Sequence, residues 1–207
     1  MQQQSVTDYT SKDIRVLEGL EAVRVRPGMY IGSTDQRGLH HLIYEILDNA
    51  VDEAMAGYCS KVLISIDTDG LISVVDDGRG IPIDVHPTTG KSGLETVMTT
   101  LHAGGKFGGG AYKVTGGLHG VGGSVVNALS IYLRAQVQRD GYTYHQEYTQ
   151  GDPTGEVVKS DKTTEHGTTI SFKPDPAIFP IIEYDFEMLI SHFKEIAFLN
   201  KGLESTS

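Results

Sequence analysis

The chain has 207 residues, 39% of them hydrophobic and 21% charged, which predicts one sizeable hydrophobic core and not two full domains. The formal net charge of −10 makes the chain by itself a weak ligand for duplex DNA, whose phosphates would repel it. The single cysteine, Cys59, excludes an internal disulfide and fits a reducing compartment. We find neither an apolar run near the roughly 20 residues of a membrane helix nor a signal peptide, so we expect a cytoplasmic protein without membrane contact.

Hydrophobic periodicity predicts the elements in chain order. Residues 1–13 are polar and form an expected N-terminal arm, and residues 14–203 form the expected domain. The expected elements are helices over 14–25, 39–57 and 93–102, a helix that begins at 124, a helix over 185–199, and strands over 62–66, 71–75, 131–138, 142–148 and 168–173. Because helices come early and strands later, with two hairpins, we predict an α+β fold. It is a two-layer sandwich whose mixed, mostly antiparallel sheet carries helices on one face.

The helix predicted over 39–57 has an apolar face and an acidic face. Glu45, Asp48, Asp52 and Glu53 gather on the acidic face, where no lysine or arginine compensates them. Like charges three or four residues apart destabilise a helix by roughly 0.2–0.5 kcal/mol per pair. Most acidic faces are simply solvated, but the absence of compensating cations favours an external cation or a catalytic role.

Three side chains on this face have the chemistry for such a role. Asn49 lies one turn after Glu45, and an amide oxygen is a ligand that suits Mg²⁺. A carboxylate beside a metal can orient and deprotonate water. His41, one turn before Glu45, is placed to hold that carboxylate. A zinc site is not expected, because there is one cysteine and no ligand-spaced pair.

The turn DDGRGIP (76–82) closes the second predicted strand. It is either an ordinary polar turn or a ligand site. A carboxylate only accepts hydrogen bonds, so an aspartate here suits an exocyclic amine such as that of adenine. Gly78 and Gly80 leave the backbone open to a flat ligand, and Arg79 could stack over its ring or pair with Glu53.

Half of the twenty residues in 104–123 are glycine, and a helix-forming segment follows at once. Glycine permits close backbone approach, backbone N–H groups at a helix start bind anions, and Lys106 and Lys113 add positive charge. The alternative interpretation is a flexible loop without a ligand. The run is neither a P-loop nor a dinucleotide fingerprint, because their spacings are absent. We therefore predict a phosphate-binding lid that orders when phosphates arrive.

Five stretches occur in a characteristic order: VRPGMYIG (25–32), EILDNAVDEA (45–54), DDGRGIP (76–82), LHAGGKF (101–107) and YKVTGGLHGVG (112–122). Together they resemble the GHKL ATPases of the Bergerat fold, which include gyrase B subunits, topoisomerase IV, MutL and histidine kinases. They are most similar to the B subunits of bacterial type II topoisomerases. The stretches YKVTGG and FKPDPAIF look nearer to gyrase than to topoisomerase IV.

The resemblance implies a role for each matching position. Glu45 matches the general base that activates water, His41 its hydrogen-bond partner, and Asn49 the Mg²⁺ ligand. Asp76 matches the acid that accepts from the adenine amine, and Thr168 supports it, partly through water. The implied cofactors are therefore ATP and Mg²⁺.

Further positions match the edges of that site. Gly80 and Pro82 match the floor under adenine, and Arg79 and Arg139 the rim that contacts competitive inhibitors such as aminocoumarins. Tyr9 matches an arm residue that reaches into the site of the second copy in a dimer. The positions that match the phosphate lid are Lys106, Tyr112, Lys113, Gly117, Leu118, His119, Gly120, Val121 and Gly122.

The resemblance also implies an ATP-operated clamp, in which two copies dimerise through their arms and trap DNA together with the gyrase A protein. The family's hydrolytic lysine lies in a following domain, so we expect this chain to bind ATP with little turnover and to be monomeric by itself. Residues 204–207 stand where other sequence is expected and are interpreted as a truncation or non-native tail. The alternatives are topoisomerase IV, a histidine kinase, and an assembly module without turnover.

Overall fold

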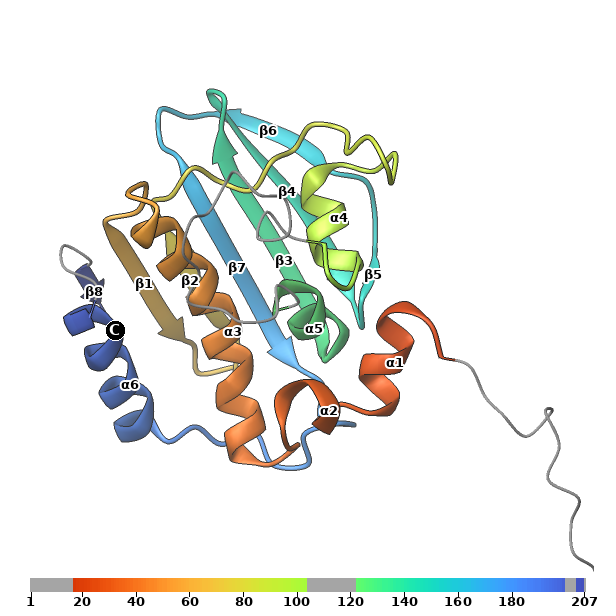
Figure 1. Cartoon of the computed structure of the whole chain (residues 1–207), viewed down its shortest axis with the longest axis vertical. Coiled ribbons are helices and arrows are strands. Elements are labelled where there is room, and N and C mark those ends of the chain that lie inside the picture. Colours follow the sequence, from red (N-terminus) through yellow and green to blue (C-terminus); the bar gives the residue numbers. More distant parts are fainter. Residues whose placement is uncertain (1–16, 104–121, 200–203, 207) are drawn as a thin grey trace, which may run out of the picture.

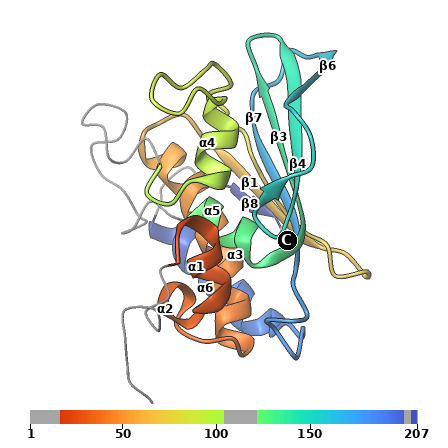
Figure 2. The ribbon, with the colours of Figure 1, turned by 90° about the vertical axis from the view of Figure 1, so that its right-hand side faces the viewer.

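The computed structural model describes residues 17–103, 122–199 and 204–206. A single sheet runs through the domain in the order β5-β4-β3-β7-β2-β1-β8, with β6 paired to β4 (Figure 1). Seen from the side, the helices lie on one face of this sheet (Figure 2). All strand pairs are antiparallel except β1 with β8, which is parallel. The predicted α+β sandwich with a mixed, mostly antiparallel sheet is therefore confirmed.

The described helices are α1 (Gly19–Val25), α2 (Gly28–Ile31), α3 (Gln36–Met55), α4 (Gly93–Thr99), α5 (Gly122–Ala128) and α6 (Phe186–Leu199). The described strands are β1 (Lys61–Ile66), β2 (Ile72–Asp76), β3 (Ser130–Arg139), β4 (Tyr142–Thr149), β5 (Asp152–Pro153), β6 (Val158–Lys162), β7 (Gly167–Pro174) and β8 (Glu204–Thr206). None of the described helices has the length and apolar character of a membrane span.

The central helix α3 starts and stops where local chemistry dictates. The Asp35 carboxylate caps its first turn by accepting from the backbone N–H groups of Arg37 and Gly38, at 2.9 and 3.4 Å. After the helix, Gly57 takes a positive φ of 83°, which is the conformation that glycine permits at a helix end. The helix begins at Gln36, three residues earlier than the sequence predicted, because Asp35 caps its first turn there.

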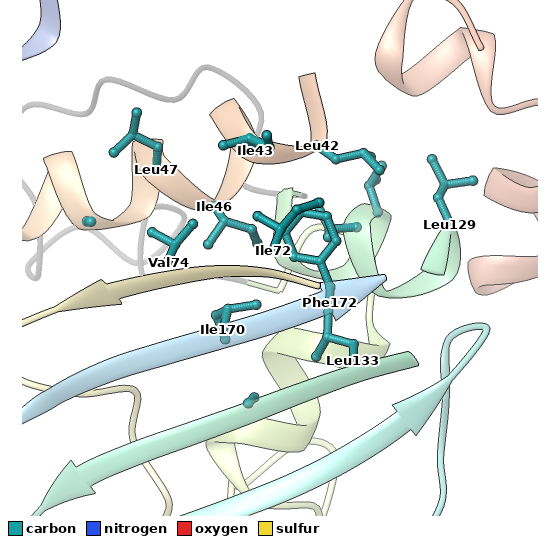
Figure 3. Close-up of a cluster of buried hydrophobic side chains, with 14 of the residues drawn as sticks. Leu42, Ile43, Ile46, Leu47, Ile72, Val74, Leu129, Leu133, Ile170 and Phe172 are labelled. Atoms are coloured by element: carbon teal, nitrogen blue, oxygen red, sulfur yellow. The ribbon is translucent and has the colours of Figure 1, made fainter. Parts of the chain in front are cut away.

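The core lies between α3 and the sheet (Figure 3). Leu42 is fully buried, and Asp52, which was placed on the acidic face, is only 1% exposed. Because α3 contacts α2 and α5 as well as β2, its buried surface is wider than one stripe. The labelled core side chains are Leu42, Ile43, Ile46, Leu47, Ile72, Val74, Leu129, Leu133, Ile170 and Phe172.

The elements that sequence periodicity missed are short or exposed. Every residue of β6 is exposed, so this strand has no apolar alternation to detect. The strands β5 and β8 have two and three residues, and α2 has four. Residues 204–206 pair in parallel with Lys61, Val62 and Leu63 of β1, and their interpretation as a truncation or non-native tail stays a prediction.

Replacing Phe172 tests whether this core carries the stability of the domain. Its side chain is fully buried on β7, so we expect Phe172→Ala to lower the free energy of unfolding by about 3–5 kcal/mol, from lost burial and the cavity left behind. Urea denaturation measures this change. Phe198→Ala is the matched control, because Phe198 is 87% exposed and its loss should change little. Equal losses in both variants would contradict this placement of the core.

Candidate functional site

The candidate site is built around the carboxylate of Asp76 at the end of β2. The antiparallel register places Asp76 opposite Thr168 of β7. Its Oδ1 atom accepts from the backbone N–H groups of Gly78 and Thr168, at 2.9 and 3.3 Å. Among the described residues no hydrogen-bond donor contacts Oδ2. One oxygen is thus held by the backbone while the other remains an acceptor for a ligand.

The surroundings of Asp76 disfavour its charge. Burial raises the pKa of this carboxyl to about 6, and the nearby carboxylates of Glu53 and Asp77 act in the same direction. The hydrogen bonds from Gly78 and Thr168 oppose this rise only in part. A ligand that donated to Oδ2 would stabilise the ionised form, so the site favours a donor such as an amine.

The adjacent Asp77 has a structural role. Burial opposes its ionisation, but hydrogen bonds from Ser60 and Lys61 outweigh burial and hold its pKa well below the usual range. Its carboxylate accepts from the Ser60 backbone N–H and hydroxyl, both at 2.7 Å, and from the Lys61 N–H at 2.9 Å. Asp77 therefore fixes the start of β1, and the two neighbouring acids have different tasks.

Two glycines in the turn are required by close packing. A Cβ atom at Gly78 would stand 2.8 Å from Asp76 Oδ1 and 2.9 Å from Glu53 Cγ. Gly80 has a positive φ of 75°, and a Cβ there would stand 2.9 Å from Val137 Cγ1. A side chain at either position would displace the turn that holds Asp76.

Arg79 is fixed by a two-point ion pair with Glu53 of α3. Its Nε and Nη2 atoms donate to the two carboxylate oxygens at 3.0 and 2.8 Å, and its backbone N–H also donates to Oε2 at 3.0 Å. The guanidinium lies 3.9 Å from the ring centroid of Tyr58. The expectation that no cation compensates the acidic face is therefore wrong for Glu53, because Arg79 comes from a different segment. On the same rim, Arg139 Nη1 donates to the Gly80 carbonyl at 3.0 Å.

On α3, the predicted pairing of His41 with Glu45 is present. His41 Nε2 lies 2.9 Å from Glu45 Oε1. This hydrogen bond raises the pKa of His41, burial opposes the rise, and the charges of Glu45 and Asp48 support it. Asn49 lies one turn further along and is exposed. Within the described residues no three His, Cys, Asp or Glu side chains form a metal cluster, and the assignment of Asn49 as an Mg²⁺ ligand stays a prediction.

The start of α5 lies against Glu45. A Cβ atom at Gly122 would stand 2.5 Å from Glu45 Oε2 and 3.1 Å from Glu45 Cβ. Gly122 is buried and is the one predicted lid position that the structure describes. The other lid positions, in 106–121, and Tyr9 lie outside the described residues and stay predictions.

The fold thus brings the predicted adenine-side residues Asp76, Arg79, Gly80 and Thr168 together with Arg139. Thr168 is 9% exposed. Pro82 lies against the start of α4, where its carbonyl oxygen is so close to Gly93 that a Cβ atom on Gly93 would collide with it. Sequence reasoning did not single out Tyr58, Ser60 or His166, which contact this turn from elsewhere in the chain. Their contacts are long-range, so no local pattern marks them.

Comparison with known proteins places these features in a family. The family model described as "Histidine kinase-, DNA gyrase B-, and HSP90-like ATPase" matches residues 34–178. The chain is 57% identical over 205 residues to the DNA gyrase B protein of Synechocystis sp., and the match covers 98% of this chain and 19% of that protein. It is 56% identical over 196 residues to the DNA gyrase B protein of Thermotoga maritima, covering 95% of this chain and 31% of that protein.

A further relative is the DNA gyrase B protein of Streptomyces niveus, which is named novobiocin-sensitive and is 56% identical over 195 residues. The match covers 94% of this chain and 28% of that protein. The chain thus spans 19–31% of the length of these relatives.

The raised pKa of Asp76 predicts that the free energy of unfolding of the domain without ligand falls as the pH rises. Because the folded-state pKa, about 6, lies above the ordinary value of 3.8, the contribution of this group to stability is full below about pH 4 and is lost as the pH rises through 6. Asp76→Asn removes this titration. At about 1.4 kcal/mol per pKa unit, the variant should gain roughly 2–3 kcal/mol relative to the wild type between pH 4 and 7. Urea denaturation across that range measures the gap, and a gap independent of pH would contradict the assignment.

Proposed function

Because the chain belongs to the histidine kinase-, DNA gyrase B- and HSP90-like ATPase family, we propose that it is the ATP-binding domain of a DNA gyrase B protein. The observation that carries the proposal is the Asp76 carboxylate, with Oδ1 held by the backbone and Oδ2 available as an acceptor, in a turn whose glycines permit the close packing that holds it. The gyrase B names of the reported relatives favour gyrase over topoisomerase IV.

Adenine would bind at the turn after β2. Its exocyclic amine would donate to Asp76 Oδ2, which suits an amine and disfavours a carbonyl, because a carboxylate cannot donate. Thr168 supports the same carboxylate through its backbone N–H. Gly80 and Pro82 would form the floor under the ring, with Arg79 and Arg139 at the rim.

The phosphates would lie toward α3 and the start of α5. Glu45 is the proposed general base, and its hydrogen bond to His41 holds the carboxylate in one orientation. Asn49 would hold Mg²⁺, which when bound neutralises phosphate charge. The predicted lid residues in 106–122, with Lys106 and Lys113, would cover the phosphates.

In the whole protein this domain would work as a clamp. ATP binding would dimerise two copies through residues 1–13, with Tyr9 of each copy completing the site of the other, and the gyrase A protein and DNA would be the other partners. ATP use would then drive strand passage and negative supercoiling in the cytoplasm. The net charge of −10 supports a division of labour in which other parts of the protein hold DNA.

The rim of the site is also the proposed inhibitor contact. Arg79 is held in place by Glu53 and Tyr58, and Arg139 by the Gly80 carbonyl, so both guanidinium groups are positioned before a ligand arrives. The relative from Streptomyces niveus is named novobiocin-sensitive. We extend that sensitivity to this chain, with aminocoumarins as competitors of ATP.

Calorimetric titration with a non-hydrolysable ATP analogue tests the two nucleotide contacts separately. Asp76→Asn should weaken binding at least about 10-fold with or without Mg²⁺, because an amide donor then faces the adenine donor. Asn49→Ala should weaken binding only when Mg²⁺ is present. Asp161→Asn, an exposed carboxylate on β6, is the matched control. Wild-type affinity in Asp76→Asn would exclude this adenine site.

ATP turnover tests the dependence on a following domain. We expect the 207-residue chain to hydrolyse ATP at least ~100-fold more slowly than the full-length Synechocystis relative. The resemblance assigns the hydrolytic lysine to a following domain, and one group that assists proton transfer contributes about 10²–10⁴-fold to a reaction rate. Steady-state phosphate release measures both rates. Equal rates would show that the 207 residues suffice for hydrolysis and would refute the expectation.

A further inference from the structure

The peptide unit that joins Gly78 to Arg79 is held from both sides. Its carbonyl oxygen lies 2.8 Å from Nδ1 of His166, in the segment that leads into β7. Its N–H group donates to Glu53 Oε2 of α3 at 3.0 Å. The carbonyl and the N–H of a trans peptide point in opposite directions, so two segments far apart in sequence form hydrogen bonds to opposite sides of one planar peptide group.

The chemistry of this contact assigns the proton on His166. A carbonyl oxygen only accepts, so Nδ1 must carry the hydrogen, whether the ring is neutral or protonated. In the neutral ring, Nε2 is then the unprotonated nitrogen. The contact therefore selects one tautomer of His166.

This peptide group is linked to the carboxylate of Asp76 through Gly78. The backbone N–H of Gly78 donates to Asp76 Oδ1 at 2.9 Å, and a Cβ at Gly78 would meet the same oxygen at 2.8 Å. Movement of the Gly78 backbone would therefore change the orientation of the carboxylate. Glu53 is already engaged by the Arg79 side chain, so His166 supplies the hold on the opposite side.

We propose that His166 is a positioning residue of the adenine pocket, which holds the Gly78–Arg79 peptide so that Asp76 presents Oδ2 to the adenine amine. This inference rests on the proposed function and adds a residue to the same site. His166 does not touch the nucleotide in this scheme, and it acts through Gly78. Because its ring is exposed and water competes for the bond, the expected effect is modest.

The affinity test uses variants that separate a donor from a mere side chain. His166→Ala removes the donor, and we expect about 3- to 10-fold weaker binding of a non-hydrolysable ATP analogue by calorimetry. His166→Asn places an amide N–H near the position of Nδ1 and should restore affinity to within about twofold of the wild type. Thr164→Ala, an exposed neighbour without a change of charge, is the control for disturbing the segment.

A second measurement requires no nucleotide. Long-range ¹H–¹⁵N correlation spectra of the imidazole, assigned by comparison with His166→Ala, should show the Nδ1–H form of the neutral His166 ring in the empty protein. The Nε2–H form would overturn the inference, as would wild-type affinity in His166→Ala or affinity in His166→Asn as low as in His166→Ala. If the wild type bound no ATP analogue, the proposed function would fail, while the tautomer would still report whether the peptide is held.

Discussion

The register of β2 against β7 is the constraint on which the site depends. Five residue pairs fix it, from Ile72 opposite Phe172 to Asp76 opposite Thr168. Along both strands alternate side chains enter the core, so a slip of one residue would turn the whole apolar set toward the other face. Asp76 belongs to that inward set. The apolar residues that stabilise the sheet therefore also hold the carboxylate on the face where the helices lie.

The same arrangement places three carboxylates close together, and each is treated differently. Asp77 is satisfied by three donors from Ser60 and Lys61, and Glu53 by the two-point pair with Arg79. Asp76 receives only backbone N–H groups on one oxygen, and the charges of the other two raise its pKa. The acids that hold the turn thus have donors on both carboxylate oxygens, whereas Asp76, the proposed ligand acceptor, has donors on one oxygen only among the described residues. A donor from outside would remove that cost, which is how a destabilising group can contribute to binding.

The sequence was sufficient where the pattern is local. The spacing of His41, Glu45 and Asn49 along one helix predicted their shared face. The turn after a strand indicated an aspartate as a possible acceptor, and the resemblance pointed to Asp76 in particular. It was insufficient where partners come from distant segments. The choice between a stacked Arg79 and one paired with Glu53 stayed open, because the pairing depends on how α3 packs beside the turn. Tyr58 and His166 carry no motif at all, and exposed β6 has no apolar period.

The described end of the glycine-rich segment shows that its glycines also serve close packing, and the lid itself stays a prediction. Its clustered glycines predicted a lid, and a lid needs backbone freedom. Yet Gly122 is buried, and a Cβ there would press on Glu45 Oε2 at 2.5 Å, while a Cβ at Gly123 would stand 3.3 Å from Met98 Sδ. These two glycines permit close packing and do not require positive φ. The start of α5 is therefore packed closely on Glu45, the proposed general base, so the space at Gly122 and the conformation of the Glu45 side chain constrain each other.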